Sequence, residues 1–134
     1  MAHEKQVLKK TQERAGRGRI SGRQKNMAAR AKRRIDFDKL RWRHEVPGAS
    51  EKRYGRNGRA LRLVRYRDAF NEPHWCQKGH VGMVLSGRIV IDFGEERVEY
   101  KAGDALFIDA GVHNRHKVMI APGEEATVLL FEDG

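Results

Sequence analysis

Apolar and polar residues alternate along much of the chain after residue 50, with the period of two that is typical of a strand with one buried face. The alternation is clearest in 88–93, where Ile, Ile and Phe occupy every second position between more polar neighbours. No segment after residue 35 has a convincing helical period. The pattern therefore predicts an all-β domain built from short strands.

Turn-forming residues separate these strands. The dipeptide Asn57-Gly58 predicts a hairpin between strands 51–56 and 59–67, because both residues tolerate positive φ. The strand 105–108 is almost wholly apolar, which indicates burial on both faces. So many short strands predict a sandwich or a barrel. The remaining predicted strands are 74–76, 81–85, 88–93, 97–100, 117–120 and 127–131.

Charge divides the chain into two parts. Residues 1–34 contain 12 Lys and Arg against two acidic residues, whereas 35–134 is neutral overall. Glycines interrupt any helix in the first part and little apolar surface is available there to bury. We therefore predict a flexible basic arm at 1–34, disordered or weakly helical, and a β-domain at 35–134. The arm could bind nucleic acid or another anionic partner, it could be a solvated tail, or translation could begin at Met27.

The remaining composition limits where the protein works. A single cysteine excludes an intrachain disulfide, which fits a reducing compartment. No apolar run approaches the length of a membrane span, and the basic start is not followed by the apolar segment of a signal peptide. We expect a cytoplasmic protein that does not enter the membrane.

Soft metal ligands gather in one short segment. Side chains at positions i and i+2 of a strand point the same way, so His74 and Cys76 are expected to converge. His80 follows after a bend at Gly79. Imidazole and thiolate together favour zinc, iron or copper over magnesium or calcium, which prefer oxygen ligands.

Two segments carry a resemblance to a known family. The first has the frame H-x-C, three residues, H, six residues, G, and the second has Gly103, five residues, and Asp109-Ala110-Gly111. In register, these resemble the two motifs of the cupin superfamily over roughly the last hundred residues. Several signature positions differ: Cys76 replaces a His, His80 replaces a Glu, Asp109 replaces a Pro, and Asn114 stands where the last His is expected.

The resemblance implies a cupin jelly-roll barrel, also called a double-stranded β-helix, of the small single-domain type. It also implies homodimer packing through sheet edges and a pocket for a metal and a small organic ligand. His116 lies two residues beyond Asn114, so on one strand it would share the inward direction, and it is the preferred fourth ligand over His113. The predicted metal site is therefore His74, Cys76, His80 and His116.

Other interpretations of these residues remain open. No inward carboxylate is expected to complete a two-His-one-carboxylate iron site. If the protein is an enzyme, the resemblance implies a metal-dependent oxygenase or isomerase. A metal-free cupin could bind or sense a small molecule, Cys76 could be a reactive thiol, and a histidine could act as a base beside Tyr66 or Tyr100. Arginines at 59, 62, 65 and 67 form either an anion-binding strip or the solvated face of an edge strand.

Overall fold

The structure is a computed structural model that describes residues 32–133, so residues 1–31 of the basic arm predicted at 1–34 lie outside the described residues. Every described strand belongs to one compact unit, Asp36–Gly134. No helix within 32–133 is long and apolar enough to cross a membrane. The strands are β1 (Arg43–Val46), β2 (Ala49–Arg56), β3 (Arg59–Tyr66), β4 (His80–Ser86), β5 (Arg88–Asp92), β6 (Arg97–Lys101), β7 (Ala105–Ile108), β8 (Lys117–Met119) and β9 (Ala126–Asp133), with 3-10 turns η1 (Phe37–Lys39) and η2 (Val112–Asn114).

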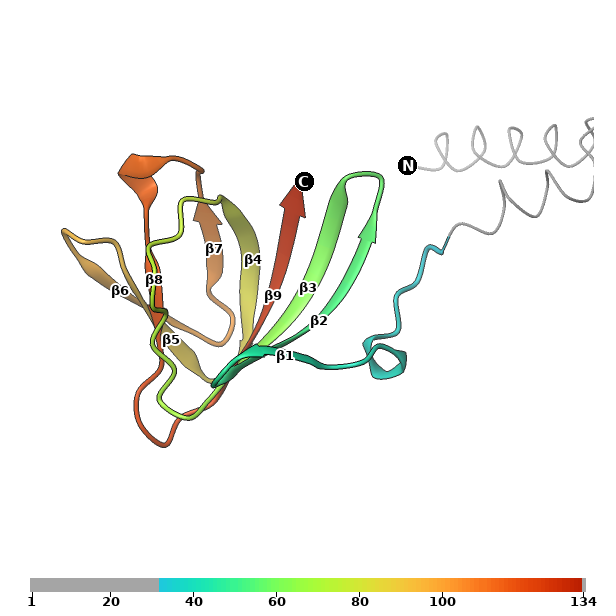
Figure 1. The fold of residues 1–134 in the computed structure, drawn as a ribbon, viewed down its shortest axis with the longest axis horizontal. Coiled ribbons are helices and arrows are strands. Elements are labelled where there is room, and N and C mark those ends of the chain that lie inside the picture. The colour runs from blue at the N-terminus through green and yellow to red at the C-terminus, as the bar shows by residue number, and fades with distance from the viewer. Residues whose placement is uncertain (1–31, 134) are drawn as a thin grey trace, which may run out of the picture. The chain divides into compact units, whose positions relative to one another are not determined.

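The strands form two antiparallel sheets that face each other (Figure 1). The larger has the order β1-β2-β3-β9-β4-β7 and the smaller the order β6-β5-β8. The buried apolar cluster takes side chains from both sheets, including Val84 and Val128 from the larger and Ile89 and Ile91 from the smaller. The all-β prediction is therefore confirmed for the described part of the chain.

The predicted hairpin is present between β2 and β3. Asn57 and Gly58 both adopt positive φ, 54° and 73°, as the tight turn requires. The two strands pair in register along their whole length, from Ala49 opposite Tyr66 to Arg56 opposite Arg59. β3 lies between β2 and β9, so it is an interior strand rather than the edge strand that one interpretation of its arginines assumed.

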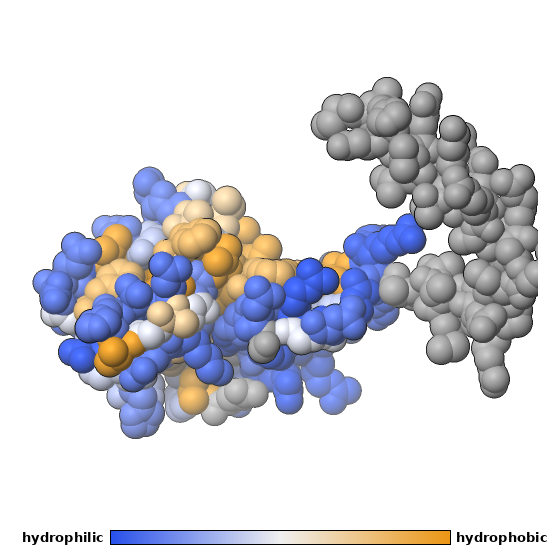
Figure 2. Space-filling model, turned by 90° about the horizontal axis from the view of Figure 1, so that it is seen from above, coloured by the Kyte–Doolittle hydropathy of each residue, from blue (hydrophilic) through white to orange (hydrophobic). Residues whose placement is uncertain are grey.

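The predicted strand 105–108 is present as β7, but the expectation that both its faces are buried is wrong. Leu106 and Ile108 face the core, whereas Phe107 is 79% exposed. Phe107 lies opposite Val81 of β4, which is also exposed, as is Met83. The outer face of the larger sheet thus carries apolar residues, and apolar surface is seen among hydrophilic residues in Figure 2. The expected homodimer stays a prediction.

The segment before β1 packs on the larger sheet. Asp36 accepts a hydrogen bond from the backbone of Asp38 and so caps η1. The Lys52 ammonium, which comes from β2, donates to the carbonyl of Phe37 at 2.7 Å and lies over the ring of Trp42. Only 8% of Lys52 is exposed, and these two contacts compensate its ammonium group for the loss of water.

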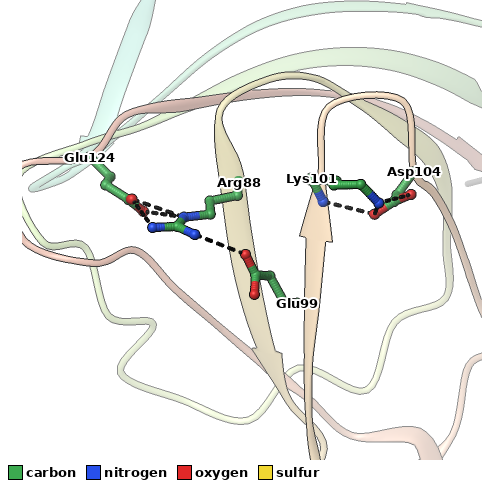
Figure 3. A network of polar contacts seen from close by, with 5 residues as sticks. All are labelled: Arg88, Glu99, Lys101, Asp104 and Glu124. Carbon is green, nitrogen blue, oxygen red and sulfur yellow. Dashed lines mark hydrogen bonds and ion pairs between the residues drawn. The ribbon is translucent and has the colours of Figure 1, made fainter.

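Exposed ion pairs lie on the smaller sheet and its neighbouring turns (Figure 3). Arg88 on β5 pairs with Glu124 and with Glu99 on β6. Asp104 accepts a hydrogen bond from the backbone N–H of Lys101 at 2.9 Å and closes the turn between β6 and β7. These pairs lie in water, so they fix local geometry more than they stabilise the fold.

Candidate functional site

A cavity of about 460 Å³ opens between the two sheets. Its apolar wall includes Val64, Ile91 and Leu130, which also belong to the core. Its polar wall holds charged residues of β2, β3 and β9 together with the candidate metal ligands. A cavity of this volume, apolar with a few converging polar groups, suits a small organic ligand.

Three of the four candidate ligands meet in this cavity. The ligand atoms of Cys76, His80 and His116 all lie within 4.8 Å of one another. His80 begins β4, in the larger sheet, whereas His116 immediately precedes β8, in the smaller. Cys76 and His116 form an isolated β-bridge, with the backbone N–H of each donating to the carbonyl of the other at 2.9 and 3.0 Å. Reciprocal hydrogen bonds therefore hold two of the three residues in place.

Both imidazoles turn the same ring nitrogen toward the centre of the cluster. The Nδ1 of His116 lies 3.0 Å from the carbonyl oxygen of Asn114, which can only accept, so this nitrogen carries the proton. The Nε2 of His80 lies 3.6 Å from the Cys76 sulfur, and its Nδ1 lies 3.3 Å from a Glu132 oxygen. That last contact is close enough for an ion pair, although it is not aligned as a hydrogen bond. Each histidine thus directs Nε2, the nitrogen that can bind a metal, toward the sulfur.

The two histidines favour the thiolate form of the cysteine. Hydrogen bonds from His116 and then His80 lower the pKa of Cys76 to about 5. Burial opposes ionisation of His116, but its hydrogen bonds with Cys76 and with the Asn114 carbonyl raise its pKa overall. The thiolate is the form of cysteine that binds metals and attacks electrophiles.

His74 does not join this group. The segment 74–76 is not a strand, so the rule that i and i+2 side chains share a face does not apply, and this strand prediction is wrong. His74 lines the cavity but is exposed, and it is absent from the cluster of three ligand atoms found in the described residues. His113 lies in η2 and is also exposed, so the structure brings His116 rather than His113 to the cysteine. The prediction assumed that His116 and Asn114 share a strand, but Asn114 lies in η2 and His116 precedes β8.

Carboxylates line the cavity, although none belongs to the Cys76, His80 and His116 cluster found in the described residues. Glu51 of β2 and Glu132 of β9 both line the cavity, and Arg62 of β3 lies between them. Arg62 donates to Glu51 at 2.5 Å and to Glu132 at 2.9 Å. Burial alone would raise the pKa of Glu132, but Arg62 lowers it overall, with a smaller contribution from His80. The sequence contained a signal for these inward charges, because residues two apart on a strand lie on the same face. Arg62 is two residues from the apolar Val64, and Glu132 is two residues from the apolar Leu130.

Glu72 is a third inward carboxylate that the sequence did not indicate. Its Oε1 accepts a hydrogen bond from the backbone of Val118 at 3.1 Å, and the side chain lines the same cavity. Burial raises its pKa, which the Val118 hydrogen bond and the two nearby histidines only partly offset. Glu72 lies in a loop without periodic pattern, so parity could not have identified it. Of the proposed acid partners, Tyr66 lines the cavity and Tyr100 does not.

Comparison with known proteins identifies the family. A profile of the cupin domain matches residues 68–131, the stretch that contains Cys76, His80 and His116. This part of the chain is a cupin domain. The resemblance predicted from the two motifs is therefore confirmed, and so is the all-β cupin fold. No curated protein sequence matches this cupin significantly.

Solved structures support the same fold. A sugar phosphate isomerase of the cupin superfamily from Silicibacter pomeroyi DSS-3 superposes with a TM-score of 0.61 at 21% identity, covering 73% of each chain. The polyketide cyclase RemF from Streptomyces resistomycificus gives 0.64 at 18% identity, covering 75% of this cupin and 78% of RemF. KdgF from Halomonas sp. gives 0.64 at 16% identity, covering 78% and 96%. At such low identities these likenesses show the fold alone.

Proposed function

We propose that this cupin binds one divalent transition metal through Cys76, His80 and His116 and holds a small organic ligand beside it. The observation that carries the proposal is the convergence of three ligand atoms within 4.8 Å, with an acceptor oxygen beside the outer nitrogen of each imidazole. A thiolate and two imidazoles are donors that suit zinc, iron or copper. Three protein ligands leave a coordination position open, which is the arrangement of a catalytic rather than a structural site.

The class of chemistry follows from what surrounds the three ligands. A bound metal would act as a Lewis acid toward an oxygen of the organic ligand. Glu72 has one oxygen held by the Val118 amide and lies on the same cavity, so it is placed to accept or donate a proton. A proton-transfer reaction such as isomerisation or cyclisation, or a metal-dependent oxygenation, is therefore the activity to screen first. Isomerase and cyclase are the activities named for two of the structural neighbours.

Metal content tests the proposal directly. Protein purified without a histidine tag should contain close to one equivalent of zinc, iron or copper by elemental analysis. Cys76→Ser and His116→Gln should each lose most of that metal, because each removes one of three ligands. His113→Gln is the matched control, since it removes an exposed histidine only three residues from His116. His74→Gln should also keep its metal, because His74 lies outside the cluster.

The opposite result would be equally informative. Absence of metal in the unaltered protein, even after reconstitution under reducing conditions, would overturn the metal assignment. The cavity would then be that of a metal-free binding or sensing cupin, and organic ligands would be screened against it. Loss of metal in His113→Gln as large as in His116→Gln would show that the bound ion does not occupy this cluster.

Glu132 is proposed to orient His80, and a paired substitution separates this role from simple charge balance. Glu132→Gln removes the carboxylate beside His80 Nδ1, and metal affinity should fall about ten-fold or more, as is usual for partners that orient a metal-binding histidine. Glu51→Gln removes the other carboxylate on Arg62 and leaves His80 untouched, so its metal affinity should change little. Competition with a metal-binding dye measures both. Equal losses in the two variants would refute an orienting role for Glu132.

A further inference from the structure

The tip of the β2–β3 hairpin and the end of β9 lie at the same end of the larger sheet (Figure 1). A second cleft, of about 720 Å³, is lined by residues of both and of the loop before β4. We propose that this cleft binds an oxyanion group, a phosphate or a carboxylate, of the same ligand whose body occupies the inner cavity. The proposal rests on the proposed function, to which it adds the substrate class. Four cationic side chains line the cleft, Arg53, Arg56, Arg59 and Lys78, against two carboxylates, Glu132 and Asp133.

The cleft adjoins the inner cavity. Arg53, Lys78 and Glu132 line both, so one ligand with a part in each would pass these three side chains. Lys78 follows Cys76 by two residues, and Glu132 contacts His80, so the shared boundary lies beside the metal ligands. An anionic group held in the cleft would therefore leave the rest of its molecule directed toward the cluster. Holding a remote charged group is a common way in which enzymes position the reacting part of a substrate.

Cationic side chains outnumber carboxylates in the lining of the cleft by two. Glu132 is already engaged by Arg62, Arg53 and His80, so little of its charge is left to neutralise the other cations. Arg59 and Lys78 form no ion pair with any of residues 32–133. Arginine presents a planar fork of donors that matches the oxygens of phosphate and carboxylate, and lysine adds a point charge. The cleft thus offers two cations for which a ligand oxyanion is a suitable partner.

An NMR titration of the full-length protein at low ionic strength tests the assignment. Inorganic phosphate and acetate are the two probes, and their relative affinities distinguish a phosphate site from a carboxylate site. The backbone amides of Gly55, Gly58, Gly79 and Ala110, which line the cleft, should shift and saturate with at least one probe. The Arg59→Gln/Lys78→Gln double variant should raise the dissociation constant about ten-fold, as expected when two partly solvated charge pairs are lost.

The control has the same net charge as the Arg59→Gln/Lys78→Gln variant. Arg97→Gln/Lys101→Gln removes one arginine and one lysine from β6, in the other sheet, and its dissociation constant should match that of the unaltered protein. Equal weakening in both double variants, or no shift of the cleft amides with either probe, would overturn the proposal. The metal content of the same samples is measured separately. Intact anion binding without metal would therefore refute only the metal site, and the reverse result only the cleft.

Discussion

Arg62 is the residue whose removal should most disturb the interior of the barrel. Its guanidinium lies 2.5 Å from Glu51 and 2.9 Å from Glu132, and the three side chains are only 22%, 12% and 15% exposed. Each contact has a Coulomb energy of roughly 6 kcal/mol at an effective dielectric constant of about 20, most of which repays desolvation. Arg62→Met leaves Glu51 without its cation and Glu132 with only the more distant Arg53 and His80. We expect a net loss of about 3 kcal/mol, at the low end for a broken buried pair because water still reaches these groups.

Urea unfolding followed by circular dichroism measures this loss. With a slope of about 1–2 kcal/mol per molar urea, the midpoint should fall by roughly 2 M. Arg53→Met is the matched control: Arg53 is 43% exposed and lies 3.5 Å from Glu132, so its midpoint should hardly move. Adding Glu51→Gln to Arg62→Met should restore part of the stability, because it removes one of the stranded charges. A loss below about 1 kcal/mol, or no recovery in the double variant, would refute the view of Arg62 as an interior clamp.

Two further substitutions test local geometry. A Cβ at Gly82 would lie 2.0 Å from the carbonyl oxygen of Leu129, so Gly82→Ala should lower the free energy of unfolding in urea by about 3 kcal/mol. Gly55→Ala is the control and should be nearly neutral, because its Cβ would lie 3.6 Å from the nearest atom. Asp104 has a lowered pKa, because it accepts a hydrogen bond from the Lys101 backbone (Figure 3), so it stabilises the fold above the pKa it has when unfolded. Asp104→Asn should lower the urea midpoint at pH 7, and the difference should disappear as the pH falls below about 4; a difference that grew instead would contradict this.

Much of the fold was predictable because it depends on local signals. Asn57-Gly58 and strict alternation in 88–93 specify a hairpin and a half-buried strand without knowledge of partners. The burial of β7 was not predictable in this way. A strand with an apolar residue left on an open outer face, as at Phe107, has the same pattern as a strand covered on both sides.

The site was predictable in its residue types and less so in its geometry. Cys76, His80 and His116 meet as a group, but the reason lies in a bridge between two segments 40 residues apart, which no local period reports. His74 was included because a strand was assumed where the chain forms none. The interior charges were missed for the opposite reason. Arg62 lies on the same strand face as the apolar Val64, yet its charge favoured a position in solvent. A guanidinium is stable inside a cavity only if carboxylates pair with it, and here they come from other strands, which the local sequence does not show.

The bridge between Cys76 and His116 also has a mechanical consequence. His80 belongs to the larger sheet and His116 adjoins the smaller, so any ion that bound all three residues would cross-link the two layers of the barrel. Opening of the layers would then require the ion to dissociate first. Amide hydrogens of β4 and β8 should therefore exchange with solvent more slowly in metal-bound protein than in metal-free protein. Occupancy of the site would then determine how often the two sheets separate locally.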